Sequence, residues 1–139
     1  MSADADCVFC KIVAGTIPCF KLFEDDDTLS FMDINPASVG HCLVIPKLHA
    51  PTVFAMDGPA LGAVMHTAKR VATAVNTVLV PDGLNLLQAN GRGAAQSVHH
   101  FHIHVLPRTI GDELALNWPV AVGDMDIISA IADRIRAAL

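Results

Sequence analysis

The longest regular hydrophobic pattern in this chain lies between Gly58 and Leu79. Apolar residues recur there at intervals of three and four, which is the spacing of one face of an α-helix. These positions are Leu61, Val64, Met65, Ala68, Val71, Ala72, Val75 and Leu79. Pro81-Asp82-Gly83 follows and ends the segment. The pattern therefore predicts one long amphipathic helix over residues 58–79.

Shorter apolar segments, separated by turn residues, precede this helix. They cover Lys21–Glu24, Thr28–Asp33 and His41–Pro46, and a run of aspartates and an Asn-Pro loop divide them. Such segments are typical of strands joined by tight turns, so we expect an antiparallel meander. A short helix is predicted before the meander over Val8–Ala14, and Gly15 stops it.

Three further elements are predicted after the long helix. Leu84–Ala89 is rich in leucine and indicates a buried strand, and Val98–Pro107 alternates strictly between the two faces of a strand. Met125–Leu139 has the pattern of a terminal helix. This order predicts a single α+β domain over residues 1–139, with an antiparallel five-stranded sheet and the helices packed on one side of it.

Composition changes this picture in one respect. The chain of 139 residues is 53% hydrophobic, yet Gly, Pro and charged residues interrupt every apolar stretch before it reaches the 18 or so residues of a membrane span. We therefore expect a soluble protein with no membrane partner. The surplus of apolar residues predicts a homodimer, because obligate dimer interfaces resemble a domain core cut in half.

The charge distribution narrows the class of partner. The formal net charge is -5, and the chain has no run of basic residues. Polymeric nucleic acid is therefore not expected as a partner. A small anion remains compatible, because backbone N–H groups bind phosphate without a positive surface. The acidic N-terminus lacks the basic and apolar regions of a signal peptide, which predicts a cytoplasmic protein.

The candidate chemistry is concentrated in His100-Phe101-His102-Ile103-His104. Alternate residues of a strand share a face, so the three imidazoles would line one surface at intervals of about 7 Å. They could form an ordinary polar strand face, although such faces usually mix several residue types. They could chelate one metal ion. Alternatively, His102 attacks phosphorus while its neighbours stabilise the phosphoryl oxygens.

The loop before the histidines bears on this choice. Residues Asn90–Ser97 contain two glycines, two side-chain amides and a hydroxyl between two predicted strands. Free N–H groups in such a loop can cradle a phosphate, which favours the nucleophilic interpretation. Many hairpin loops have a similar composition, so the loop does not decide the question.

Three segments resemble the histidine triad (HIT) family. Gln96–Leu106 is similar to its His-φ-His-φ-His-φ-φ signature, preceded by the Gln-Ser of the Hint branch. Phe31–Pro36 and Gly40–His49 resemble the nucleotide-binding strand and the segment that follows it. The similarity covers about Cys7–Leu106. It implies a HIT-like fold whose sheet continues across a homodimer, with the long helix and a sheet edge paired about the axis.

The resemblance also implies roles for individual residues. His102 would be the nucleophile that forms a nucleotidyl-histidine intermediate, and the carbonyl of His100 would orient its ring. His104 would bond the phosphate, and His41 would lie behind the triad. Asp33 would hold the ribose hydroxyls. The phosphate or leaving group would be contacted by Asn90, Gln96 and Ser97. The purine pocket would be formed by Phe9, Ile12, Phe31 and Ile34.

The pair Cys7-x-x-Cys10 is either a redox dithiol or half of a metal site. The βαβ pattern in which a redox dithiol usually lies is missing from this sequence. A four-coordinate zinc site needs two further ligands, and His49 and His100 supply imidazoles. Bacterial HIT proteins with an N-terminal Cys-x-x-Cys resemble this arrangement, which implies a structural zinc and no catalytic metal. Cys19 and Cys42 are expected to be small buried hydrophobes.

These implications predict an enzyme. The expected reaction is substitution at the α-phosphorus of a purine nucleoside phosphoramidate or a related conjugate, releasing the nucleoside monophosphate. A dinucleoside polyphosphate hydrolase would use the same nucleophile with another leaving group. A slowly reacting nucleotide-binding regulatory module is the alternative from another class. The tail over residues 107–139, which contains Trp118, has no counterpart in these motifs and leaves the leaving group open.

Overall fold

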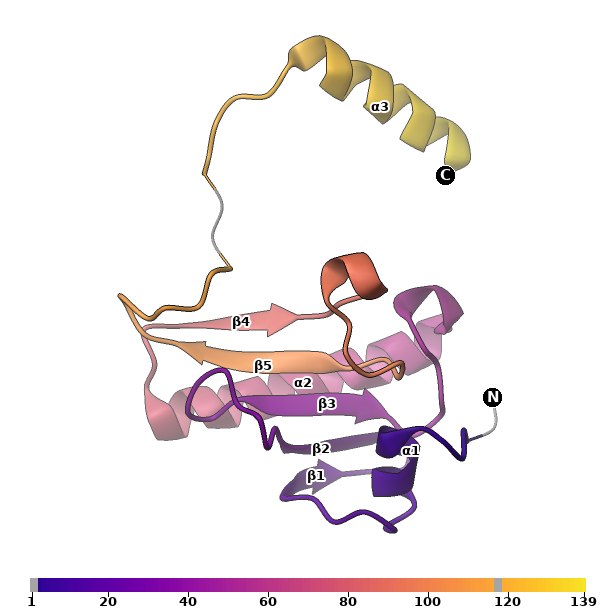
Figure 1. Cartoon of the computed structure of the whole chain (residues 1–139), viewed down its shortest axis with the longest axis vertical. Coiled ribbons are helices and arrows are strands. Elements are labelled where there is room, and N and C mark those ends of the chain that lie inside the picture. The colour runs from indigo at the N-terminus through magenta and orange to yellow at the C-terminus, as the bar shows by residue number, and fades with distance from the viewer. Residues whose placement is uncertain (1–2, 117–118) are drawn as a thin grey trace.

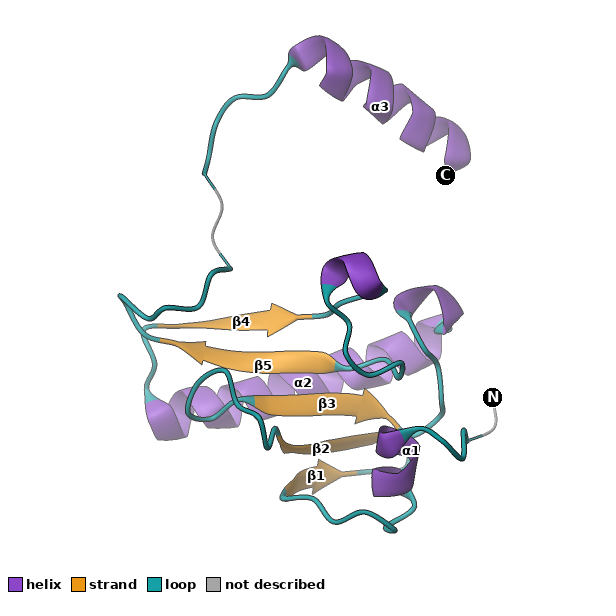
Figure 2. Ribbon diagram, in the orientation of Figure 1, coloured by secondary structure: helices purple, strands orange, loops and turns teal. Residues whose placement is uncertain are grey.

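A computed structural model describes residues 3–116 and 119–139, so Trp118 lies outside the described residues. Figures 1 and 2 show one antiparallel sheet with the strand order β1-β2-β3-β5-β4. The strands are β1 (Lys21–Glu24), β2 (Thr28–Met32), β3 (Cys42–Pro46), β4 (Gly83–Leu87) and β5 (Ile103–Arg108). The helices are α1 (Val8–Val13), α2 (Gly58–Leu79) and α3 (Met125–Ala138), with 3-10 turns at Val53–Ala55 and Arg92–Ala94. The predicted α+β architecture is confirmed.

The bounds of α2 are those that its hydrophobic pattern predicts. The Asp57 carboxylate caps the N-terminus by accepting a hydrogen bond from the Ala60 N–H at 2.8 Å. Val80 ends the helix in the left-handed conformation, with φ of 45°. The buried face of α2 packs on the sheet through Val64, Thr67, Ala68 and Val71.

The sheet separates two hydrophobic clusters, because successive side chains of a strand point to opposite faces. Cys42 and Val44 of β3 pack with α2, whereas Leu43 and Ile45 pack with Phe9 of α1. The two helices therefore lie on opposite faces of the sheet, and the expectation that all helices pack on one side is wrong. Helical periodicity identifies an apolar face but not the side of the sheet that receives it.

Two predicted strands also need correction. β4 is an edge strand whose Leu86 and Leu87 are 43% and 37% exposed, so it is not the buried strand that its leucine content indicates. β5 begins at Ile103 rather than at Val98, since β3 pairs only with Ile103–Val105. The chain before Ile103 leaves the ladder, and the Phe101 N–H donates to the Ala50 carbonyl at 2.6 Å.

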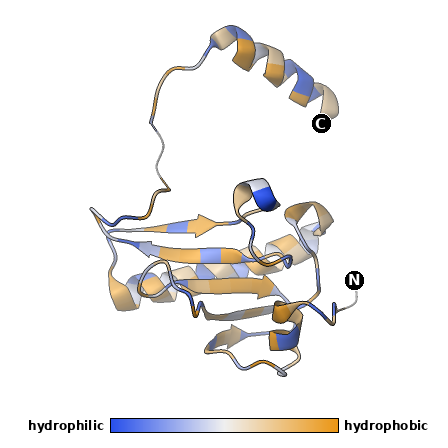
Figure 3. Cartoon of the chain, in the orientation of Figure 1, coloured by the Kyte–Doolittle hydropathy of each residue, from blue (hydrophilic) through white to orange (hydrophobic). Residues whose placement is uncertain are grey.

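The segment after β5 runs along the sheet edge and then leaves it. The Arg108 guanidinium binds the Asp112 carboxylate through two nitrogens and donates to Asn85 of β4 and to the Leu114 carbonyl. Beyond this anchor the tail passes the β4 edge, and α3 lies apart from the sheet (Figures 1 and 3). None of the helices in the described ranges combines the length and apolar content that crossing a membrane requires.

The close approach of the loop before β3 to α2 can be tested at Gly40. Its φ is +91°, and a Cβ there would overlap Leu79 Cδ1 and lie 3.2 Å from Pro107 Cγ. We expect Gly40→Ala to lower the free energy of unfolding by about 2 kcal/mol or more. In urea denaturation, Gly58→Ala at the open start of α2 is the control, with a change within about 1 kcal/mol. Equal effects of the two substitutions would contradict this account.

Candidate functional site

A pocket of about 430 Å³ lies on the α1 face of the sheet, opposite α2. One wall is apolar and is formed by Val8, Phe9, Ile12, Ile17, Phe31 and Leu43. The other end is polar and contains Asp33, His41, Ser97, His102 and His104. Residues predicted as a purine pocket and as a phosphate site thus line one cavity. A concave site with an apolar wall and a few convergent polar groups is the usual form of a small-molecule site.

The His102 ring has a fixed orientation. Its Nδ1 lies 2.6 Å from the His100 carbonyl oxygen, and only a protonated nitrogen can donate to a carbonyl. Nδ1 therefore carries the proton in the neutral ring, and Nε2 keeps its lone pair. The edge of the Phe9 ring packs on the imidazole, with centroids 5.3 Å apart. His102 therefore presents an unprotonated nitrogen in a pocket that is largely shielded from water.

A chain of hydrogen bonds sets the tautomer of His104. The Ala37 N–H donates to His41 Nδ1 at 2.9 Å, so the proton of neutral His41 is on Nε2. His41 Nε2 lies 2.8 Å from His104 Nδ1, which must then accept. This leaves the proton of His104 on Nε2. His104 thus supplies a donor beside the lone pair of His102, and the two rings are 4.8 Å apart.

Burial keeps these imidazoles neutral. It lowers the pKa of His104 to about 4, and it lowers the pKa values of His102 and His41 below the usual 6.5. The hydrogen bond to the His100 carbonyl and the negative charge of Asp33 oppose this shift at His102. Desolvation remains the largest effect at each ring, because a buried cation loses hydration that one carboxylate does not replace.

Cys7, Cys10, His49 and His100 converge on one point beside this pocket. The His49 and His100 Nδ1 atoms are 3.3 Å apart, and Cys10 Sγ lies 3.4 Å and 3.6 Å from them. Cys7 Sγ lies 3.5 Å from His100 Nδ1. Ligands of a tetrahedral zinc ion would be roughly 3.3–3.8 Å apart, given Zn–N of about 2.0 Å and Zn–S of about 2.3 Å.

The surroundings of these four residues also suit a metal. His100 Nε2 donates to the Pro46 carbonyl at 2.8 Å, which leaves the Nδ1 lone pair directed at the cluster. His49 Nε2 lies 3.8 Å from the Asp4 carboxylate, a pairing common behind zinc-bound imidazoles. The Cys10 and Asp4 N–H groups donate to the Cys7 and Cys10 sulfurs, as backbone N–H groups can do to metal-bound sulfur. The cluster can therefore hold a tetrahedral metal ion.

A second group, Asp33, His41 and His104, is equally compact but does not fit a metal. Coordination through His41 Nε2 would displace its proton. The proton could not move to Nδ1, because the Ala37 N–H already points at that atom. These three residues are therefore a hydrogen-bonded relay, in which His41 donates to His104 and lies 3.4 Å from Asp33.

The remaining predicted residues occupy different places. Ser97 lines the pocket, and Ile34 is 76% exposed at its rim. The Gln96 amide is bonded to Gly91, Pro51 and Val98, and the Asn90 amide is bonded to Val53 and Gln88. Gln96 and Asn90 therefore shape the loop before the histidines, and their polar groups are engaged by protein partners rather than directed into the pocket.

Sequence reasoning missed several contributions of the backbone. The Pro46 carbonyl and the Ala37 N–H fix the tautomers of His100 and His41, and no side-chain pattern marks either group. Ile17, Pro18 and Cys19 line the pocket from the connection between α1 and β1. Their composition is that of an ordinary loop, so only the folded arrangement reveals them. Cys42 is buried as expected, whereas Cys19 is only half-buried.

Comparisons with known proteins agree with this geometry. A family model for the HIT domain matches residues 14–110. An adenosine 5'-monophosphoramidase of Schizosaccharomyces pombe is 38% identical, with 96% of this chain and 98% of that protein aligned. A crystal structure from Streptococcus mutans superposes with a TM-score of 0.93 at 36% identity, covering 99% of this chain and 88% of that chain. A zinc-bound histidine triad family protein of Mycobacterium smegmatis matches with a TM-score of 0.75 at 32% identity, covering 96% and 98% of the two chains.

The tautomers and lowered pKa values can be measured by NMR. We expect long-range ¹H–¹⁵N spectra to show the proton on Nδ1 of His102 and on Nε2 of His104. Because burial disfavours the cation, both rings should stay neutral as the pH falls through 6.5, with His104 titrating near 4. A His102 or His104 ring that becomes protonated at or above pH 6.5 would contradict this interpretation.

Proposed function

Because the chain belongs to the HIT domain family, we propose that it is a hydrolase or transferase of purine nucleotides that acts at the α-phosphorus. The substrates are nucleoside phosphoramidates or related nucleotide conjugates, and the product is the nucleoside monophosphate. The observation that carries this proposal is the free lone pair of His102 Nε2, fixed by the bond from Nδ1 to the His100 carbonyl.

The geometry suggests two chemical steps. His102 Nε2 attacks phosphorus, an N–P bond forms, and the bond to the leaving group breaks. The leaving group departs with the electron pair of that bond and takes a proton from solvent. Water then attacks the nucleotidyl-histidine, the N–P bond breaks to regenerate the neutral ring, and water returns one proton to solvent. The Nε2 proton of His104 can stabilise a phosphoryl oxygen during both steps, since its Nδ1 already accepts from His41.

Substrate binding divides between the two ends of the pocket. The apolar wall around Phe9, Ile12 and Phe31 suits a purine ring, because aromatic and branched side chains bury its faces. The Asp33 carboxylate lies between this wall and the histidines, where it can accept hydrogen bonds from ribose hydroxyls. Ser97 lines the cavity beside the triad and can donate to the leaving group.

The similarity to an adenosine 5'-monophosphoramidase favours a phosphoramidate over a dinucleoside polyphosphate. A slow regulatory binding module would need the pocket but would not need the lone pair of His102 aimed at a substrate. Three functions are thus to be separated: a phosphoramidase, a dinucleoside polyphosphate hydrolase and a slow binding module. Steady-state assays with an adenosine phosphoramidate, with a diadenosine polyphosphate and without substrate separate them.

The cluster of Cys7, Cys10, His49 and His100 is assigned to a structural zinc ion. The spacing and tautomers of its ligand atoms support the assignment. When bound, zinc would supply folding free energy rather than chemistry at phosphorus. It would also hold α1 against the sheet, because Cys7 caps α1 and Cys10 lies within it.

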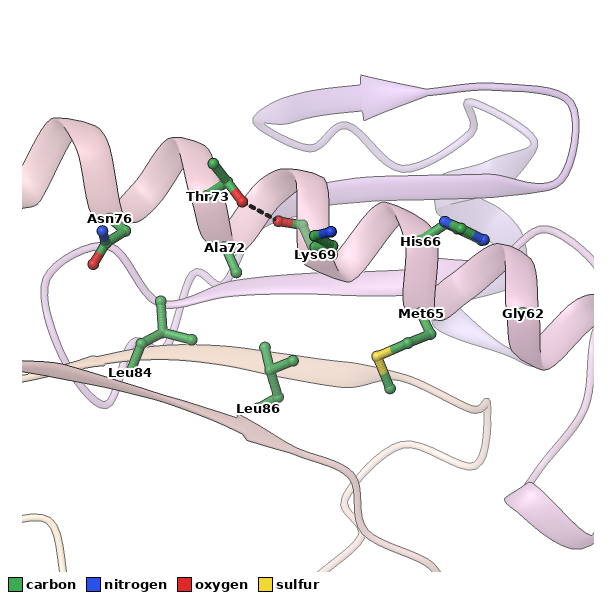
Figure 4. A pocket seen from close by; sticks show the side chains of 9 residues that line it. All are labelled: Gly62, Met65, His66, Lys69, Ala72, Thr73, Asn76, Leu84 and Leu86. Carbon is green, nitrogen blue, oxygen red and sulfur yellow. Dashed lines mark hydrogen bonds between the residues drawn. The ribbon is translucent and has the colours of Figure 1, made fainter.

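The edge of the sheet supports a homodimer. Met65 and Ala72 of α2 and Leu84 and Leu86 of β4 face a common open cavity of about 720 Å³ (Figure 4). β4 also presents the unpaired backbone groups of an edge strand, which a second β4 can satisfy. A two-fold axis beside β4 would pair both features with themselves and continue the sheet through the interface.

The nucleophile is tested by His102→Asn. We expect kcat to fall by about 10³-fold or more, because the covalent step loses its attacking nitrogen. Affinity for adenosine monophosphate should change by less than about threefold, since Asp33 and the apolar wall remain. His99→Asn, at the exposed neighbouring position, is the control and should keep wild-type turnover. Near wild-type turnover by His102→Asn would exclude the mechanism, as would failure to trap any nucleotidyl-enzyme.

The metal is tested by elemental analysis and thermal unfolding. We expect one zinc per chain in protein purified without chelator, and none after Cys10→Ala. That substitution should clearly lower the melting temperature, because the metal contributes folding free energy. The turnover of the folded fraction should fall much less. Cys42→Ala removes another buried thiol and should retain the zinc. Zinc retained by Cys10→Ala, or missing from the wild type, contradicts the assignment.

A further inference from the structure

Helix α3 is strongly amphipathic, yet none of the residues that the structure describes in its own chain covers its apolar face. Ile127, Ile128, Ile131 and Ile135 lie on one face and are 62%, 51%, 42% and 56% exposed. Ser129, Asp133 and Arg136 lie on the opposite face. Among the described residues of α3 none is buried. An isolated helix of 14 residues is marginal in water, so it needs a surface on which to bury its apolar face.

The direction of the tail is set by the anchor at the end of β5. Arg108 binds Asp112, Asn85 and the Leu114 carbonyl, and the Ile110 N–H donates to Asp82. These bonds hold the start of the tail along β4 and carry it past the edge of the sheet. The tail thus leaves at the edge where a second copy would pair.

The same placement recurs in a crystal. The Streptococcus mutans structure superposes over 99% of this chain with a TM-score of 0.93, a coverage that includes α3. A helix free in solvent would not keep one direction relative to the sheet in two proteins at 36% identity. The recurrence indicates that a contact outside the single chain holds α3.

Among the described residues, a second apolar groove stays open after the β4 edge is assigned to the dimer. It lies between the second half of α2 and the strands β1 to β3, with a volume of about 550 Å³. Leu22, Phe23, Val39, Val75, Val78 and Leu79 line it, and Val39 and Val78 are 85% and 76% exposed. We call this surface the α2–β1 groove. Apart from Arg70, which stacks on Phe23, its lining is apolar and suits the isoleucine face of α3.

We propose that the α2–β1 groove of one copy receives α3 of a second copy, so that the two chains of the dimer exchange their C-terminal helices. This inference rests on the homodimer of the proposed function. The β4 edge is not a receptor for α3, because its unpaired backbone groups require another strand. The exchange buries the isoleucine face of α3 and the α2–β1 groove, which are both exposed in the single chain, and it needs no further partner.

Two substitutions test the contact by equilibrium sedimentation. Ile131→Asp on α3 and Val78→Asp in the groove should each weaken the dimer at least tenfold, because each buries a charge in an apolar contact. Ser129→Asp, on the polar face of α3, and Thr77→Asp, outside the groove, are matched controls that should leave dimerisation unchanged. A dimer unaffected by Ile131→Asp overturns the proposal, as does equal weakening by the controls.

Cross-linking identifies the chain that donates the helix. A size-tagged Ile131→Cys chain is mixed with an untagged Val78→Cys chain and treated with a short bis-maleimide. We expect a tagged-to-untagged product, and none when Ser129→Cys replaces Ile131→Cys. The native cysteines are the same in both mixtures. A third sample is the double variant with Ile131→Cys and Val78→Cys in one chain. If it cross-links only within its own chain, and the mixture gives no tagged-to-untagged product, exchange is overturned in favour of folding back.

Neither the sedimentation experiment nor the cross-linking experiment depends on catalysis. Phosphoramidate hydrolysis by the Ile131→Asp variant, measured well above its dissociation constant, reports separately on the proposed function. A β4-paired dimer that is active but gives no cross-link between chains therefore rejects the exchange alone. Loss of hydrolysis in an intact, cross-linked dimer points instead to the assignment of the reaction.

Discussion

The geometry of the site depends on the hydrogen bonds and contacts that His100 makes in the folded chain. Its Nε2 donates to the Pro46 carbonyl, its Nδ1 faces two cysteines and a second imidazole, and its own carbonyl accepts from His102 Nδ1. One residue thus connects the end of β3, the proposed metal cluster and the proposed nucleophile. Because its ring is fully buried, none of these polar groups can exchange its partner for water without cost.

Helix α1 extends this coupling to the pocket. Its N-cap residue belongs to the cysteine and histidine cluster, and its Phe9 packs on the rings of His102, His100 and Phe31. A helix of six residues has little stability alone, so its position depends on these contacts. The same contacts exclude water from the histidines, which keeps them neutral and strengthens each hydrogen bond that they make.

Local patterns predicted most of the elements. The bounds of β1 and α2 agree with their predicted ranges, since the flanking turn and capping residues are local signals. The errors concern neighbours in space. The leucine content of Leu84–Ala89 could not show that β4 lies at an edge, and the alternation after Val98 could not show that the Phe101 N–H leaves the ladder to bond the Ala50 carbonyl. Helical periodicity likewise did not show that α1 and α2 cover opposite faces.

The sequence alone determined which chemistry is available. The spacing of the motif brings His100, His102 and His104 close together, and the family motifs attach expected roles to His102 and Asp33. The sequence did not show that β5 begins only at Ile103, or that the His100 ring turns to the cysteines while His102 and His104 line the pocket. Only the tertiary structure decided the protonation site of each ring, because the deciding partners are backbone groups of Pro46, Ala37 and His100. It also separated the metal-compatible cluster from the His41 relay. Every residue carries the same backbone groups, so no sequence pattern marks where the fold aims them.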